Sequence, residues 1–232
     1  MNKAISNTIS KAISFVRLDF ITVKPYLTVK NLCIFDGVAL IMLIVNNSAA
    51  GAIGLIMAFA ALYASYPFTI GEKSNMDVLY ITLSIKRNTV VSGRYLFALT
   101  LDVFAGLFTF VFSFAVLTIM QRNFKAMETL ITIPVLFIAF SVIQAIQLPI
   151  YFKLNYTKAK FIAYIPFVVL PLAIFAGSSF FADIFTMEQI NGTLERLAAN
   201  IPAAVLTIAA IWFAFMTISY KISLSFYKKR DF

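Results

Sequence analysis

The sequence has no histidine, a single cysteine and few charged residues, and each shortage excludes a class of function. Without imidazole side chains, histidine-based acid–base catalysis and the usual zinc sites cannot be built. Cys33 has no second cysteine with which to form an internal disulfide, and its apolar surroundings are typical of a small packing residue. Charged residues make up only 12% of the chain. So small a charged fraction is not expected of a water-soluble enzyme.

Apolar residues are abundant instead. The chain of 232 residues is 61% hydrophobic, with a mean hydropathy of +0.91, so most of it must be solvated by a lipid bilayer. The apolar residues form continuous runs and do not alternate with polar ones, which favours helices over a β-barrel. We therefore predict an all-α membrane protein with a single transmembrane domain over residues 1–232.

Six apolar runs are long enough to cross a bilayer. They cover residues 22–45, 49–70, 96–120, 129–152, 161–182 and 201–220. The first run is the weakest, because Asp36 interrupts it and its length depends on residues flanked by Lys24 and Lys30. Residues 183–200, between the last two runs, are predicted to form an extracellular segment.

The N-terminal residues 3–20 carry apolar side chains at helical spacing, with serines and basic residues on the other face. The apolar positions are Ile5, Ile9, Ile13, Val16 and Phe20. This pattern predicts an amphipathic helix. It lies either on the membrane surface, among the headgroups of membrane lipids, or on the protein's own spans, and the pattern fits both.

The basic residues predict the orientation of the spans. Of the 19 lysines and arginines, only Arg122, Lys125 and Arg196 fall on one side of a six-span model, and the other 16 fall on the opposite side. Because basic loops stay in the cytoplasm, both termini and the polar segment 71–95 are predicted to be cytoplasmic, in the cell membrane. The net charge of +9 is explained by this bias, so no nucleic-acid partner is expected.

The segment 71–95 is a charged, polar stretch between the second and third apolar runs. Its Gly71-Glu72-Lys73-Ser74 sequence has a superficial similarity to the end of a phosphate-binding loop, but Glu72 separates the glycine from the lysine. It also lacks the glycine that such a loop carries five residues earlier. The chain is therefore not expected to be an enzyme that hydrolyses ATP by itself, and it needs no cofactor of its own.

Four polar side chains inside the apolar runs are candidates for a substrate path: Asp36, Asp102, Gln144 and Gln147. A carboxylate within a span is costly and is expected to face the bundle interior or water. The alternative is structural, with each aspartate paired to a cation such as Arg94 or Lys30. The two glutamines share one helix face, where they could line a path or bond neighbouring helices.

The stretch YPFTIGEKSNMDVLYITLSIKRNTVVSGRYL, residues 66–96, resembles the segment between the second and third spans of short bacterial ABC-2-type transporter permeases, such as those of peptide exporters. In that family an acidic residue follows span two, here Glu72. A run similar to Leu-Pro-Ile-Ser-Arg precedes span three, and here Leu83-Ser84-Ile85-Lys86-Arg87 has Ser84 in place of proline. The length and the six spans also agree with the family.

The resemblance implies a permease subunit that pairs with a second permease subunit, as a homodimer or heterodimer, and exports an amphipathic or hydrophobic cargo such as an antimicrobial peptide. ATP and magnesium would bind to a separate cytoplasmic ABC ATPase subunit. That subunit would dock on a coupling helix within residues 71–95. The residues expected to contact it are Met76, Asp77, Val78, Leu79, Tyr80, Ile81, Leu83, Lys86 and Arg87.

Two other functions fit the same sequence. One is a secondary transporter coupled to an ion gradient through Asp36 and Asp102. The other is a membrane scaffold that transports nothing and recruits a cytoplasmic partner through the segment 71–95.

Overall fold

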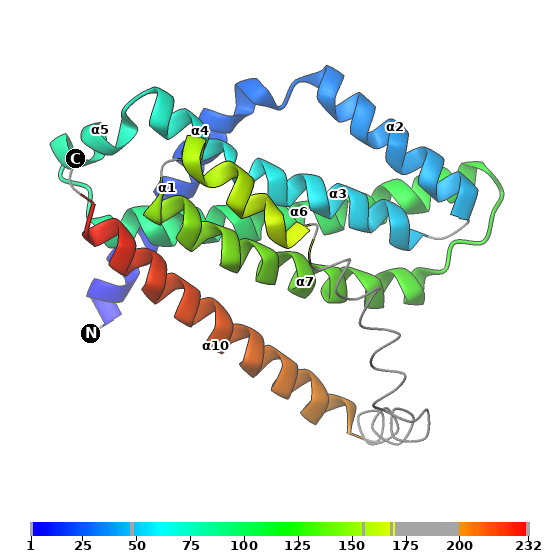
Figure 1. The fold of residues 1–232 in the computed structure, drawn as a ribbon. Helices are drawn as coiled ribbons and strands as arrows, with labels where there is room; N and C mark the ends of the chain where they lie inside the picture. The colour runs from blue at the N-terminus through cyan, green and yellow to red at the C-terminus, as the bar shows by residue number, and fades with distance from the viewer. Residues whose placement is uncertain (1, 47–48, 155, 168, 170–199, 231–232) are drawn as a thin grey trace.

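The computed structural model describes all residues except 1, 47–48, 155, 168, 170–199 and 231–232, and the described chain is helical, without β-strands (Figure 1). The helices are α1 (Asn2–Val23), the 3-10 helix η1 (Lys24–Tyr26), α2 (Val29–Asn46), α3 (Ala49–Tyr63), α4 (Tyr66–Lys73), α5 (Met76–Thr82), α6 (Arg87–Ile119), α7 (Ala126–Lys153) and α10 (Ile201–Lys228). Residues 156–167 are helical as well. The predicted all-α class is confirmed.

Within the described residues, four stretches are long and apolar enough to cross a membrane: Ala49–Lys73, Arg87–Ile119, Ala126–Lys153 and Ile201–Lys228. A fifth is present if Ser10–Tyr26 and Val29–Val45, which meet at a bend of 86°, form one broken span. These stretches contain four of the six predicted runs. Most of the predicted span 161–182 and nearly all of the predicted extracellular segment 183–200 lie outside the described residues, so six spans remain a prediction.

The chain between α1 and α2 differs from the predicted first span. Residues 22–45 were expected to form one helix, but α1 continues to Val23 and α2 starts only at Val29. Pro25 lies in η1 between them, and its ring nitrogen cannot donate the backbone hydrogen bond that would continue α1. The first apolar run is therefore broken at its start.

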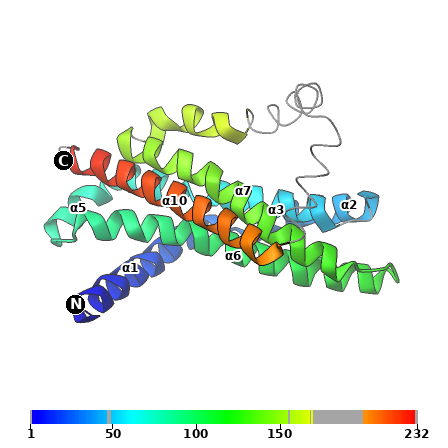
Figure 2. The ribbon, with the colours of Figure 1, turned by 90° about the horizontal axis from the view of Figure 1, so that it is seen from below.

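Helices α3, α6 and α7 pack side by side, α10 packs along α7 and the start of α6, and α1 crosses α6 at an angle (Figures 1 and 2). Helix α5, the start of α1 and the end of α10 lie at the same end of this bundle in both views. We call this the α5 end. The segment 71–95 is divided there among the end of α4, all of α5 and the first turns of α6.

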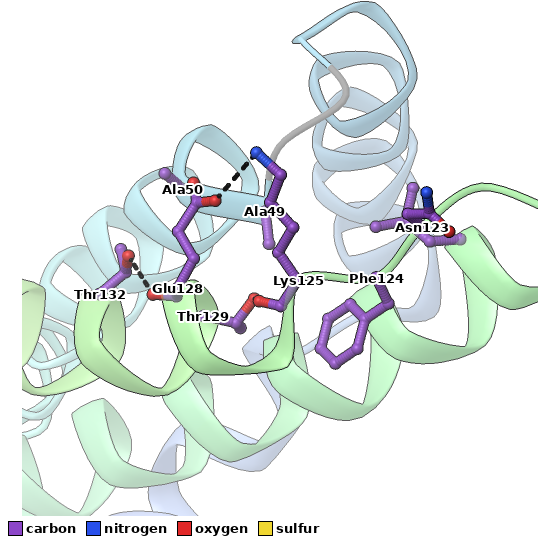
Figure 3. A pocket seen from close by; sticks show the side chains of 9 residues that line it. Ala49, Ala50, Asn123, Phe124, Lys125, Glu128, Thr129 and Thr132 are labelled. Atoms are coloured by element: carbon purple, nitrogen blue, oxygen red, sulfur yellow. Dashed lines mark hydrogen bonds and ion pairs between the residues drawn. The ribbon is translucent and has the colours of Figure 1, made fainter.

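The link between α6 and α7, residues 120–125, lies at the opposite end of the bundle. Arg122 donates from Nη1 to the carbonyl oxygen of Ile44 at 2.7 Å, which ties this link to the end of α2. Figure 3 shows the crevice beside it, where Lys125 Nζ lies 3.4 Å from Glu128 Oε2. The crevice has a volume of about 10 Å³, which is room for one water molecule at most. It is too small for a cargo.

Candidate functional site

Helix α5 lies between two residues in the left-handed conformation. Asn75 precedes it with a φ of 48°, and Ser84 follows it with a φ of 53°. At its end the Ser84 N–H donates to the Ile81 carbonyl and the Ile85 N–H donates to the Tyr80 carbonyl, both at 2.9 Å. These two bonds form a Schellman motif, and Ile85 packs against the buried cluster that contains Tyr80. The chain therefore turns sharply on both sides of α5.

Ser84 stands at the position where the family resemblance leads us to expect proline. Its backbone conformation is one that proline cannot adopt. Proline fixes φ near −65° and has no N–H. Ser84 has a φ of 53° and uses its N–H in the turn. The turn that ends α5 is thus built differently from one that contains proline.

The two faces of α5 have opposite environments. Tyr80, one of the predicted contact residues, is only 4% exposed and packs among buried side chains of α1, α6 and α7. It therefore lies on the inner face of α5. The outer face carries large apolar side chains that are about half exposed: Val78 (52%), Leu79 (47%), Ile81 (49%) and Leu83 (61%). Lys86 is exposed beside them, and Met76 is half-buried.

Asp77 and Arg87 hold the last helix at the α5 end. The Tyr227 hydroxyl donates to Asp77 Oδ1 at 2.9 Å, and Arg230 Nη1 lies 3.8 Å from Asp77 Oδ2. Arg87 Nη1 donates to the carbonyl oxygens of Tyr227, at 3.1 Å, and of Lys228. A cation at the C-terminal carbonyls of a helix is favourable. Both residues were expected at the rim of a partner contact, and the structure uses them to bind α10.

A buried ion pair joins α1 to α6 behind α5. Arg94 Nη1 lies 2.9 Å from Asp19 Oδ1, and the two side chains are 6% and 1% exposed. The guanidinium also lies over the rings of Phe15, 5.6 Å from its centroid, and Phe68, at 4.9 Å. The sequence suggests Arg94 as a partner for Asp36 or Asp102, but in the structure its partner is Asp19, which the sequence does not indicate.

We call Asp19, Asp77, Arg87, Arg94 and Tyr227 the junction. Its members come from the consecutive helices α5 and α6 and from α1 and α10, which are far from them in the sequence. Asp77 joins α5 to α10, Arg87 joins α6 to α10, and the pair of Asp19 and Arg94 joins α1 to α6. The opposite charges of Asp19 and Arg94 were visible in the sequence, but nothing indicated that these two residues are neighbours.

The ion pair also sets the rotation of α1. Its buried stripe is Ala12, Phe15, Asp19 and Val23, whereas Ile13, on the predicted apolar face, is 58% exposed. Val16 and Phe20 of the predicted face do pack against the buried cluster that contains Val23, so the buried face overlaps the predicted one and also includes Asp19, which faces Arg94. Of the two predicted settings for this helix, the structure shows packing on the protein's own helices.

Gly93 allows α1 to approach α6 closely. A methyl group at this position would lie within 2.9 Å of the Phe15 Cβ and Cγ. Phe15 in turn packs edge-on against Tyr80 of α5, with ring centroids 5.2 Å apart. The glycine thus lets a single aromatic side chain connect α1, α5 and α6.

Glu72, the acidic residue that carries part of the family resemblance, lies at the end of α4. Its Oε2 accepts a hydrogen bond from the Thr157 N–H at 3.0 Å, at the start of the helical residues 156–167. A carboxylate is favourable at a helix N-terminus. Glu72 therefore links α4 to the chain that follows α7.

The candidate substrate-path residues do not gather in one place. Gln144 Nε2 donates to Asp102 Oδ1 at 2.9 Å between α7 and α6, and Gln147 Nε2 donates to the Ala163 carbonyl at 2.7 Å. Both are contacts between helices. Asp36 lies elsewhere, half-buried in a cleft between α2, α3 and α6 that Asp102 does not line. These positions give no support to a shared ion path through both aspartates.

The sequence comparison decides the family. A family model described as "ABC-2 family transporter protein" matches residues 14–228, nearly the whole chain. The chain belongs to the ABC-2 transporter permease family. No curated protein and no solved structure matches it. The family resemblance drawn from residues 66–96 is confirmed. Permeases of this family are membrane components that are usually not enzymes and that act with an ABC ATPase and a permease partner.

Proposed function

We propose that this chain is the permease subunit of an ABC exporter and that a separate ATPase subunit docks on the outer face of α5. The observation that carries the proposal is the apolar face of Val78, Leu79, Ile81 and Leu83, about half exposed on a helix that the junction holds in place. Exposed apolar side chains grouped on a polar end of a protein are typical of a protein–protein interface.

A groove beside this face would enlarge the docking surface. It has a volume of about 420 Å³ and lies between α1 and the turn from α5 to α6. Phe15, Leu18 and Leu83 give it an apolar lining, and Lys11 and Lys86 lie at its border. A partner with an apolar side chain flanked by carboxylates would fit this chemistry.

The junction supplies a route for movement from α5 to the spans. Asp77 is bonded to Tyr227 of α10, and Arg94, behind α5, is paired with Asp19 of α1. A partner that pulled or tilted α5 would move these helices with it, because packed elements respond as rigid bodies. ATP and magnesium belong to the partner in this scheme, and the chain itself supplies only the moving spans.

The predicted orientation agrees with this arrangement. The positive-inside bias places the α5 end in the cytoplasm, where ATP is available, and the start of α1 and the end of α10 lie at the same end (Figure 1). A second permease subunit would complete the transport path. An amphipathic or hydrophobic cargo suits the cleft of about 340 Å³ that aromatic and aliphatic side chains line together with Asp36.

Replacing Leu79 and Leu83 with aspartate tests the docking. Both side chains point outward, so the chain should still fold, while the charges should abolish co-purification of an ABC ATPase from the native membrane. The matched control is Ser74→Asp with Asn88→Asp, which adds the same charge at exposed positions off the apolar face and should leave the complex intact. Equal recovery of the ATPase with both double variants would remove α5 from the interface.

A further inference from the structure

Asp102 is the carboxylate buried most deeply in the described bundle. It lies near the middle of α6, about 22 Å from the start of the helix and about 25 Å from its end at 1.5 Å per residue. Its exposure is 0%, and that of Gln144, which faces it from α7, is 1%. Neither side chain reaches the aqueous phase. The proposed docking at α5 makes no use of this pair.

Within the described bundle, the pair is joined by one hydrogen bond and has two oxygens without a partner. Gln144 Nε2 donates to Asp102 Oδ1 at 2.9 Å. Among the residues that the structure describes, none donates a hydrogen bond to Asp102 Oδ2 or to Gln144 Oε1, and both oxygens are buried. Such groups are rare in a folded protein and need an explanation. Here both are acceptors, and both belong to the same pair of side chains.

A nearby lysine or arginine does not explain how the Asp102 carboxyl is accommodated in the described bundle. Within the described part of the chain, no lysine or arginine lies within ion-pair distance of Asp102, and Arg94 of the same helix is engaged with Asp19. An ionised carboxylate with one amide donor in the interior of a membrane protein would be strongly disfavoured.

We propose that Asp102 and Gln144 form a proton-binding site. A proton taken from water resides on Asp102 Oδ2 and is donated to Gln144 Oε1, while Gln144 Nε2 donates to Asp102 Oδ1. This cyclic acid–amide pair satisfies both otherwise unpartnered oxygens with one proton. Loss of the proton would leave a buried charge and two facing acceptors, and would favour separation of α6 from α7. The site is independent of the proposed function, because it requires no ATPase.

Infrared spectroscopy of the purified full chain in lipid nanodiscs at pH 7 tests the site. The spectrum should contain the C=O stretch of a protonated carboxylic acid, shifted to lower frequency in D₂O. Asp102→Asn should remove the band and keep the fold, since two amides can form the same cyclic pair. Asp36→Asn is the matched control and should keep the band, because Asp36 is only half-buried in a separate cleft.

Gln144→Leu tests whether Gln144 is the hydrogen-bond partner of the Asp102 carboxyl. The Asp102 carbonyl would lose the Gln144 N–H donor, so the band should move to higher frequency; an unchanged frequency would exclude the cyclic pair. A wild-type spectrum without the band, or a band that survives Asp102→Asn, would overturn the proposal. A band that appears only in sodium-free buffer would assign the site to a metal cation and would overturn it as well.

Discussion

Asp19 and Asp102 are both almost fully buried, and the structure accommodates them in different ways. Asp19 lies against the cation Arg94 at the α5 end, whereas Asp102 lies against the neutral amide of Gln144 in the middle of α6. A carboxylate paired with a cation can stay charged. One that faces only an amide is stable when it carries a proton. The comparison shows that the α5 end contains a buried ion pair, whereas in the middle of the bundle a carboxyl–amide contact joins α6 to α7.

Removing one charge of the Asp19–Arg94 ion pair should have the largest effect on the stability of the protein. Asp19→Asn leaves the Arg94 guanidinium buried without a counter-charge, which should cost about 3–5 kcal/mol of stability. The measurement is the thermal unfolding midpoint in detergent micelles. Replacing both residues with apolar ones, as Asp19→Leu with Arg94→Met, should recover most of the loss, because no buried charge remains. An unchanged midpoint for Asp19→Asn would show that the pair is not formed.

Crowding the contact between Gly93 and Phe15, beside the ion pair, should have the next largest effect on stability. In Gly93→Ala the new methyl group meets Phe15 and must push α1 away from α6, at a cost of about 1–3 kcal/mol. Gly37→Ala is the matched control, because a methyl group at Gly37 has nothing within 4 Å. Thermal unfolding should separate the two variants clearly. Equal midpoints would mean that α1 does not pack on α6 at this point.

Loosening the link between α5 and α10 should have a smaller effect. Tyr227→Phe removes the hydrogen bond to Asp77 and keeps the ring, so about 1 kcal/mol should be lost. Hydrogen exchange measured by mass spectrometry should show faster exchange in α5 and at the end of α10. Exchange that is unchanged at both places would indicate that this bond does not connect the two helices.

Replacing Asp102 with asparagine, which can keep the contact with Gln144, should have the smallest effect on stability. Asp102→Asn keeps a cyclic pair with Gln144 and introduces no charge, so the unfolding midpoint should shift by less than the equivalent of about 1 kcal/mol. Asp102→Leu, which leaves both polar groups of Gln144 without this partner, should cost more. A loss with Asp102→Asn as large as that of Asp19→Asn would show that Asp102 is charged and paired with a cation, and would remove the contrast between the two carboxylates.

The sequence predicted the parts of the fold that depend on local composition. Continuous apolar runs indicated α3, α6, α7 and α10, because each run is long enough by itself to require a lipid environment. The polar stretch that contains α5 was also found, because it interrupts these runs and resembles the family.

The parts that depend on distant neighbours were not predicted. The burial of Asp19 depends on Arg94, 75 residues away in the sequence, and periodicity alone therefore did not place Asp19 on the buried face of α1. Tyr80 could not be distinguished from the outward side chains of α5, since only the packing of α1 and α6 determines which face is covered. The residue types of Asp77 and Arg87 suggested a partner, but their partner proved to be α10.

The most direct test of docking at α5 is photo-crosslinking in the native membrane, with a photoreactive amino acid placed either at Leu79 or at Tyr80. Leu79 is about half exposed on the outer face, and Tyr80 is buried one position further on. We expect a crosslink to an ABC ATPase subunit from position 79 and only crosslinks within the chain from position 80. A crosslink to the ATPase from neither position, or equally from both, would contradict the assignment of α5 as the docking helix.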